Sequence, residues 1–258
     1  MTLFFGEHDD VVFTKPPLKT VVVQINFPTI LSLLNQAGMT GFRSILSDDY
    51  PEGIKENIGY VFPSPPPNQV ANQPPIWSMQ NEAKIWTVNL SANFLSLETS
   101  EYTGIDDFLI RFRKVLDAAH RTLRLAPSTR IGFRKINFFD PPNKSDLSDF
   151  RSILKKPALG MLGISDFPAK IVKGFSQTVF ADSDNSFQIT AGLAINHLTS
   201  TQGYIFDMDY STEKRFDIDD GELLLARLRN FSDGMTNYFH WATLDEYKDT
   251  LQPKPRSR

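Results

Sequence analysis

The chain has 258 residues, of which 41% are hydrophobic and 22% charged, and its formal net charge is −3. This balance is typical of an ordinary globular protein and gives no overall attraction to nucleic acid. Because the sequence contains no cysteine, it excludes a disulfide framework, a thiolate zinc site, an iron–sulfur cluster and a cysteine nucleophile.

The first ten residues include Glu7, Asp9 and Asp10 and do not combine a basic start with an apolar run. We therefore expect no secretory signal there. No stretch approaches about 18 consecutive apolar residues, so we expect no membrane-spanning helix and no membrane partner. These features predict a cytoplasmic protein, and no motif calls for a cofactor.

Strand and helix signals alternate at the start of the chain. Residues 20–27, with three consecutive valines, predict a strand that Pro28 ends. Short helices are expected at 29–37 and 41–49. Residues 62–75 contain six prolines in fourteen positions, which excludes a regular helix or a central strand.

The middle of the chain contains the clearest helix signal. Residues 76–79 and 84–90 predict a hairpin whose second strand runs on to 99. Residues 104–125 predict a long helix, because apolar side chains recur at three- and four-residue spacing and acidic residues stand at its start. A strand is expected at 129–139.

The second half repeats the order of strand signals followed by a long helix. A linker rich in proline and glycine is expected between the two halves at 141–162, with a short helix inside it at 145–154. The remaining predicted elements are strands at 169–180, 186–196 and 203–210, a helix at 218–250 broken near Gly234 or Trp241, and a frayed tail at 251–258.

These elements predict an α+β fold in which antiparallel sheet is packed by two long helices. We expect one structural unit over residues 1–258. The similar order of elements suggests an internal duplication, with halves 1–140 and 163–250, each of a helix-grip or ferredoxin-like kind.

Charge is unevenly distributed. Residues 101–135 contain eight Lys or Arg against four Asp or Glu, and residues 205–222 contain seven acidic against two basic residues. The two segments are candidates for complementary surfaces that bind a protein partner or pair two copies in a homodimer. Alternatively, the basic segment binds nucleic acid through phosphate contacts. The candidate contact residues are Arg113, Arg121, Arg124, Arg130 and Arg134.

Asp207 and Asp209 stand two residues apart near the end of a predicted strand, so their carboxylates are expected on one face of the sheet. Such pairs bind Mg²⁺ in phosphoryl-transfer enzymes. The two residues are the candidate metal ligands. No third ligand can be assigned, and no phosphate loop or nucleophile motif accompanies them, so catalytic residues remain unassigned.

Three segments of the chain resemble a known family. They are residues Lys15 to Phe27, the predicted helix with the Arg-x-Ile-Asn strand that ends at Asn137, and the segment that begins Phe206-Asp207-Met208-Asp209. They are similar to a sporadically distributed prokaryotic family of about this length with no established function. Patchy distribution implies genes carried with mobile or defence-type loci. The resemblance therefore implies a partner in an antiviral or toxin–antitoxin-type system, and it supplies no catalytic residues.

Three functional hypotheses follow from these observations. The first is a non-enzymatic interaction or regulatory protein that works with another protein. The second is a nucleic-acid-binding or RNA-processing protein that uses the basic segment. The third is a Mg²⁺-dependent enzyme centred on Asp207 and Asp209.

Overall fold

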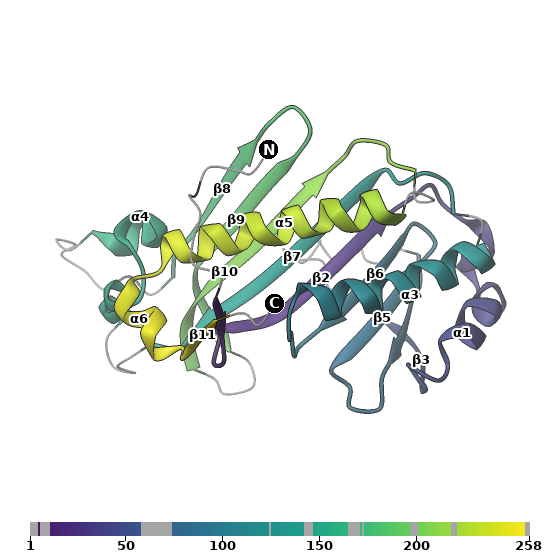
Figure 1. Cartoon of the computed structure of the whole chain (residues 1–258), viewed down its shortest axis with the longest axis horizontal. Coiled ribbons are helices and arrows are strands. Elements are labelled where there is room, and N and C mark those ends of the chain that lie inside the picture. The colour runs from purple at the N-terminus through teal and green to yellow at the C-terminus, as the bar shows by residue number, and fades with distance from the viewer. Residues whose placement is uncertain are drawn as a thin grey trace. The chain divides into compact units, whose positions relative to one another are not determined.

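The computed structural model describes residues 5, 11–57, 74–123, 125–141, 147–164, 171, 173–196, 201–217 and 221–255. Over these residues the protein is α+β (Figure 1), as the sequence predicts. Nine strands form an antiparallel sheet in the order β3-β4-β5-β6-β2-β7-β10-β9-β8, and a two-stranded sheet pairs β1 with β11. No helix in this part of the chain is both long and apolar enough to cross a membrane.

The strands share the short lengths usual in globular proteins. They are β1 (Val11–Phe13), β2 (Leu18–Asn26), β3 (Glu52–Asn57), β4 (Ile76–Gln80), β5 (Trp86–Ser91), β6 (Phe94–Thr99), β7 (Arg130–Phe139), β8 (Phe175–Ala181), β9 (Ser186–Asn196), β10 (Thr201–Thr212) and β11 (Pro253–Pro255).

Two helices, α3 and α5, are far longer than the rest. The α-helices are α1 (Thr40–Leu46), α3 (Ile105–Leu123), α4 (Lys156–Leu159), α5 (Gly221–Ala242) and α6 (Asp245–Thr250). The 3₁₀ turns are η1 (Leu31–Leu34), η2 (Gln36–Met39), η3 (Leu147–Ser152) and η4 (Gly160–Gly163).

The strand order is similar in the two parts of the chain. In the first half, β2 pairs with the last strand of the meander β4-β5-β6, and α3 follows. In the second half, β7 neighbours the last strand of the meander β8-β9-β10, and α5 follows. Both parts contain a strand, short helical turns, a meander and a long helix, but the first part has an additional strand, β3, which pairs with β4.

The chain forms two compact units, which are assembled from interleaved segments. Unit 1 contains residues 1–19, 134–210 and 229–258, whereas unit 2 contains residues 20–133 and 211–228. Each unit therefore takes residues from both parts of the sequence. Their boundaries differ from the predicted halves 1–140 and 163–250, which follow the chain continuously.

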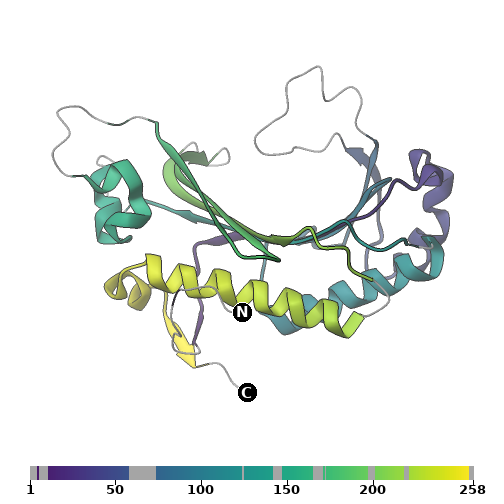
Figure 2. The same ribbon diagram turned by 90° about the horizontal axis from the view of Figure 1, so that it is seen from above.

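In unit 2, α3 packs across β2, β5 and β6 (Figures 1 and 2). The contact is centred on Phe108, which is fully buried. Its ring centroid lies 5.5 Å from those of Trp86 on β5 and Phe133 on β7, and 6.0 Å from that of Tyr102. The apolar stripe that predicts this helix is therefore the face that it buries.

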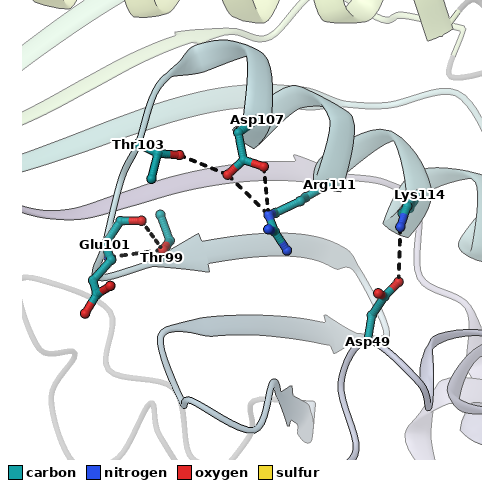
Figure 3. A network of polar contacts seen from close by, with 7 residues as sticks. All are labelled: Asp49, Thr99, Glu101, Thr103, Asp107, Arg111 and Lys114. Carbon is teal, nitrogen blue, oxygen red and sulfur yellow. Dashed lines mark hydrogen bonds and ion pairs between the residues drawn. The ribbon is translucent and has the colours of Figure 1, made fainter. Parts of the chain in front are cut away.

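The first turns of α3 are held by side-chain contacts (Figure 3). Asp107 accepts hydrogen bonds from Thr103 Oγ1 at 2.9 Å and Arg111 Nε at 3.1 Å. The Arg111 guanidinium also lies 4.8 Å from the centre of the Trp86 ring, a cation–π distance. Nearby, Thr99 Oγ1 accepts from the backbone N–H of Glu101 at 3.1 Å. These contacts fix the turn that leads from β6 into the helix.

In unit 1, the C-terminal part of α5 packs on the second meander through aromatic rings. Phe231 stacks on Tyr210 of β10 with centroids 4.5 Å apart, and Tyr238 meets Phe187 of β9 at 5.8 Å. Gly234 permits the close approach, because a Cβ there would lie 2.7 Å from the Tyr210 ring. The helix therefore continues through Gly234 and ends at Ala242, beside the second predicted break at Trp241.

The helix predicted at 29–37 is wrong, because η1 and η2 occupy this stretch. Trp77 Nε1 donates to the Leu33 carbonyl at 2.9 Å, which a continuing α-helix would use internally. Gly38 lies so close to the carbonyl of Ser32 that a Cβ would overlap it. The chain therefore turns tightly here, before α1 begins at Thr40.

Three further expectations are corrected. The strand expected to run on to 99 turns at Ala92 and Asn93 and returns as β6, giving a meander. The short helix at 145–154 is a 3₁₀ turn where described. Part of the tail predicted to fray at 251–258 is β11, which pairs with β1. The proline-rich stretch 62–75 lies outside the described residues up to 73.

Candidate interaction surface

The basic side chains in the middle of α3 are paired with carboxylates. Arg113 donates from Nε to Asp117 Oδ1 at 3.0 Å and from Nη1 to Glu222 Oε1 at 2.9 Å. The hydrogen bond to Asp117 is the main cause that raises the pKa of Arg113. Lys114 Nζ lies 3.6 Å from Asp49 Oδ2 (Figure 3). A guanidinium that holds two carboxylates offers little net charge to a phosphate.

The remaining basic candidates of unit 2 are Arg121, Arg124 and Arg130. Arg121 is exposed near the end of α3, and Arg124 lies outside the described residues. Arg130 is the first residue of β7, and its side chain lies along its own strand. This follows from the position of its guanidinium over Gly132, where an added Cβ would come 2.5 Å from Arg130 Nη1. The absence of a side chain at Gly132 thus makes the space that the guanidinium occupies.

In unit 1, Arg134 joins the predicted nucleic-acid surface to the predicted metal site. Its Nε donates to Asp207 Oδ1 at 2.6 Å, and its Nη2 donates to Asp207 Oδ2. This is the bidentate geometry of strong arginine–carboxylate pairs. Because both oxygens of Asp207 accept from one guanidinium, a Mg²⁺ ion at Asp207 would bind beside a positive charge, which disfavours it.

Asp209 stands two residues further along β10 and is half-buried. Within the described ranges, no group of three or more His, Asp or Glu side chains is placed to hold a metal ion. The metal site at Asp207 and Asp209 therefore stays a prediction. It would need further ligands beyond the groups that the described residues place together.

The predicted acidic and basic segments meet within the chain itself. Arg113 pairs with Glu222 inside unit 2, and Arg134 pairs with Asp207 inside unit 1. The sequence suggested that these complementary charges bind a partner. At these four residues the opposite charges instead pair with each other within the chain.

Lys135, the last residue of the basic segment, points into the interior of unit 1. Its Nζ donates to the Ser232 carbonyl at 3.1 Å, to Ser232 Oγ at 2.9 Å and to Thr236 Oγ1 at 3.0 Å. The side chain is buried. It secures α5 to β7 and offers no charge to a phosphate at the surface.

A row of uncharged polar side chains crosses unit 2 on the face of the sheet opposite α3. The strand register places Ser78 opposite Asn89, Asn89 opposite Ser96, and Ser96 opposite Gln24. We call these four residues, on β4, β5, β6 and β2, the polar row. Trp86 points to α3, and side chains alternate along a strand, so Asn89 points to the other face.

Hydrogen bonds orient the side chains of the polar row. Ser78 Oγ donates to Asn89 Oδ1 at 2.6 Å, and Asn89 Nδ2 donates to Ser96 Oγ at 3.3 Å. At the end of the row, Gln24 Nε2 donates to Asn26 Oδ1 at 3.0 Å. Asn89 and Gln24 remain half-buried, whereas the two serines are buried. The row is therefore a preorganised set of amide and hydroxyl groups.

The face around the polar row is almost uncharged. Gln80 Nε2 donates to Thr87 Oγ1 at 3.2 Å in a second, parallel line of the face. In β4, β5, β6 and residues 20–26 of β2, the one charged residue is Glu98. Such a face has the hydrogen-bonding groups that a peptide or another polar surface requires, but not the cations that a phosphate backbone requires.

The polar row was not among the sequence-predicted candidates. The alternation Thr87-Val88-Asn89-Leu90-Ser91 is a signal for a strand with one polar face. It does not reveal which residues on other strands stand beside Asn89, because that depends on the register of four strands from two separate parts of the chain.

A scan against models of known protein families finds no match to this chain. A search of curated proteins likewise finds no significant match.

Proposed function

We propose that the protein is a non-enzymatic binding protein and that the face with the polar row, where Asn89 and Gln24 are the more exposed members, is its recognition surface for a protein partner. The observation that carries this proposal is the alignment of Ser78, Asn89, Ser96 and Gln24 across four strands on an almost uncharged face. Oriented amides and hydroxyls pair with the polar groups of a protein surface at little cost in side-chain ordering.

The resemblance to a sporadic prokaryotic family supports a partner of a particular kind. We propose that this partner belongs to a defence or toxin–antitoxin-type system and is encoded near the gene for this protein. The alternative of nucleic-acid binding has less support, because Arg113, Arg134 and Lys135 are engaged within the chain.

The test is to purify the tagged protein from its native host, with and without nuclease, and to identify what accompanies it. We expect a stoichiometric protein that survives nuclease treatment. Nucleic acid that is lost with nuclease, together with binding that weakens steeply as salt rises, would instead favour the basic-surface hypothesis.

A pair of variants tests whether the partner binds at the polar row. Thr87→Arg places a long cation on the polar face, next to the row, and we expect it to release the partner. Ser100→Arg makes the same substitution at an exposed position beyond the end of β6 and should leave binding unchanged. Equal binding by both variants, each folded by circular dichroism, would show that the partner binds elsewhere.

A metal-dependent activity is tested separately. A thermal shift with Mg²⁺ or Mn²⁺ that disappears in Asp207→Ala would favour the enzyme alternative. Because Asp207→Ala also breaks the pair with Arg134, the shift must be compared with that of Arg134→Ala. No shift in the parent protein would remove the metal proposal.

A further inference from the structure

The edge strand β8 lacks the features that usually protect the edge of a sheet. Among the described strands, β8 has a neighbour on one side only, namely β9. Its seven residues pair with β9 in an unbroken register. The strand contains no proline and no charged residue, and Phe175 and Val179 keep 52% and 54% of their surfaces exposed. Natural proteins normally protect an edge of this kind with charges, prolines or bulges.

The other edge strand of the nine-stranded sheet has that protection. The β3 sequence includes Glu52, Lys55 and Glu56, and its pairing with β4 is irregular between Glu52 and Lys55. The contrast indicates that the smooth, uncharged edge of β8 serves a purpose, since an unprotected edge of this length otherwise favours aggregation.

The hydrogen bonds at both ends of the β8–β9 ladder show which backbone groups face outward. Leu193 N donates to the Gly174 carbonyl at 3.0 Å, and Asp182 N donates to the Asn185 carbonyl at 3.0 Å. In an antiparallel pair, hydrogen-bonded positions alternate, so the even-numbered residues from 174 to 182 face β9. The backbone groups of four residues therefore face the free edge: Phe175, Gln177, Val179 and Ala181.

We propose that this edge binds β8 of a second copy of the chain, so that two protomers join antiparallel about a two-fold axis at Thr178. This register overlaps all seven residues and uses all four outward-facing positions. Gln177 pairs with Val179 of the second copy, and Phe175 pairs with Ala181 of the second copy. A large side chain thus meets a small one on each side of the axis.

Charge supports the same register. Lys173, exposed two residues before β8, comes opposite Ser183 of the second copy. Ser183 lies between Asp182 and Asp184 in the β8–β9 turn. Each end of the joined strands therefore brings one lysine beside two carboxylates. The two-fold symmetry repeats this contact at the other end.

The absence of cysteine permits a direct test of the register. In the proposed dimer, Thr178 forms a non-hydrogen-bonded pair with its own copy, where Cα atoms are about 4.5 Å apart and a disulfide can close. We expect Thr178→Cys to form a covalent dimer under mild oxidation. A single cysteine at Ile195→Cys, which is also an exposed position but lies on β9, should not do so.

Solution measurements complete the test. Light scattering coupled to size exclusion should give a dimer across a micromolar dilution series. Val179→Lys should convert it to monomer, because the two introduced ammonium groups would lie diagonally across the joined strands on the same face and repel each other. Ile195→Lys, which changes another exposed β-branched residue of unit 1, should remain dimeric. A monomeric parent protein, or a dimer that Val179→Lys leaves intact and Thr178→Cys does not cross-link, would overturn the proposal.

Discussion

Phe108→Ala tests whether one ring fastens α3 to the sheet of unit 2. Phe108 is fully buried and contacts Trp86, Tyr102 and Phe133. Truncating a buried phenylalanine to alanine costs about 3–5 kcal/mol, which includes the transfer term and the cavity left behind. Because three aromatic neighbours each lose a ring partner, we expect a value of about 4 kcal/mol or more.

The matched control lies two residues away on the same helix. Ile110 keeps 63% of its surface exposed, so Ile110→Ala should change the free energy of unfolding by less than about 0.5 kcal/mol. Alanine also has a higher helix propensity than isoleucine, so we expect little loss of stability from this substitution. The comparison separates burial from any general effect of substitution in α3.

Tryptophan fluorescence provides an assay that is specific to this unit. Of the three tryptophans, Trp77 and Trp86 lie in unit 2 and Trp241 lies in unit 1. In a Trp241→Phe background, urea unfolding followed by fluorescence therefore reports unit 2 alone. If Phe108→Ala and Ile110→Ala unfold within about 1 kcal/mol of each other, the packing of α3 does not depend on this cluster.

Three further predictions follow. Asp182→Ala should destabilise by about 0.5–2 kcal/mol, measured by urea unfolding, because Asp182 Oδ1 accepts from two backbone N–H groups of the β8–β9 turn. The hydrogen bond from the Asp184 backbone is the main cause that lowers the pKa of Asp182, so this stability should be present above the unfolded pKa and be lost as pH falls through the folded value. Burial raises the pKa of Tyr50 and Tyr238 to about 12, so the unfolded phenols should ionise from about pH 10 while the buried phenols stay protonated. The fold should therefore lose up to about 3 kcal/mol per tyrosine as pH rises from about 10 to 12, and Tyr50→Phe should reduce this alkaline loss in a pH series of thermal unfolding. Gly132→Ala should cost less than about 1 kcal/mol of stability, because its Cβ meets the flexible end of Arg130, and an unfolded variant would contradict that assignment.

The sequence predicted those parts of the fold that depend on local periodicity. The stripe that contains Phe108 gave α3 within two residues of its ends, because the buried side of a long helix repeats with a fixed spacing. Valines 21 to 23 likewise marked β2. The order of elements also suggested an internal duplication, which stays a prediction, and the strand order is similar in the two parts of the chain.

The remainder depends on contacts between residues far apart in the chain. The turn at Leu33 is set by Trp77, 44 residues later, and β1 pairs with a strand some 240 residues away. The strand β11 could not be predicted because two of its three residues are prolines, which usually exclude a strand. As an edge strand of a two-stranded sheet, β11 tolerates them.

The candidate site was missed for a similar reason. Charge patterns are visible in a sequence, but whether a charge is already neutralised is not. Arg113 and Glu222 are 109 residues apart, and only the fold shows that they pair. The polar row consists of residue types that are common on any surface, and their alignment becomes evident only in the strand register.

The interleaving of the two units has a consequence for how the protein is made. When a ribosome has released the chain as far as Phe133, unit 2 still lacks residues 211–228, and unit 1 awaits residues 229–258. Residues 211–258 therefore complete both units. The nascent second meander must wait with its apolar face uncovered until α5 emerges, and during this time chaperones are expected to hold it. Ribosomes stalled before residue 211 should consequently carry chains that proteases digest readily, with neither unit protected.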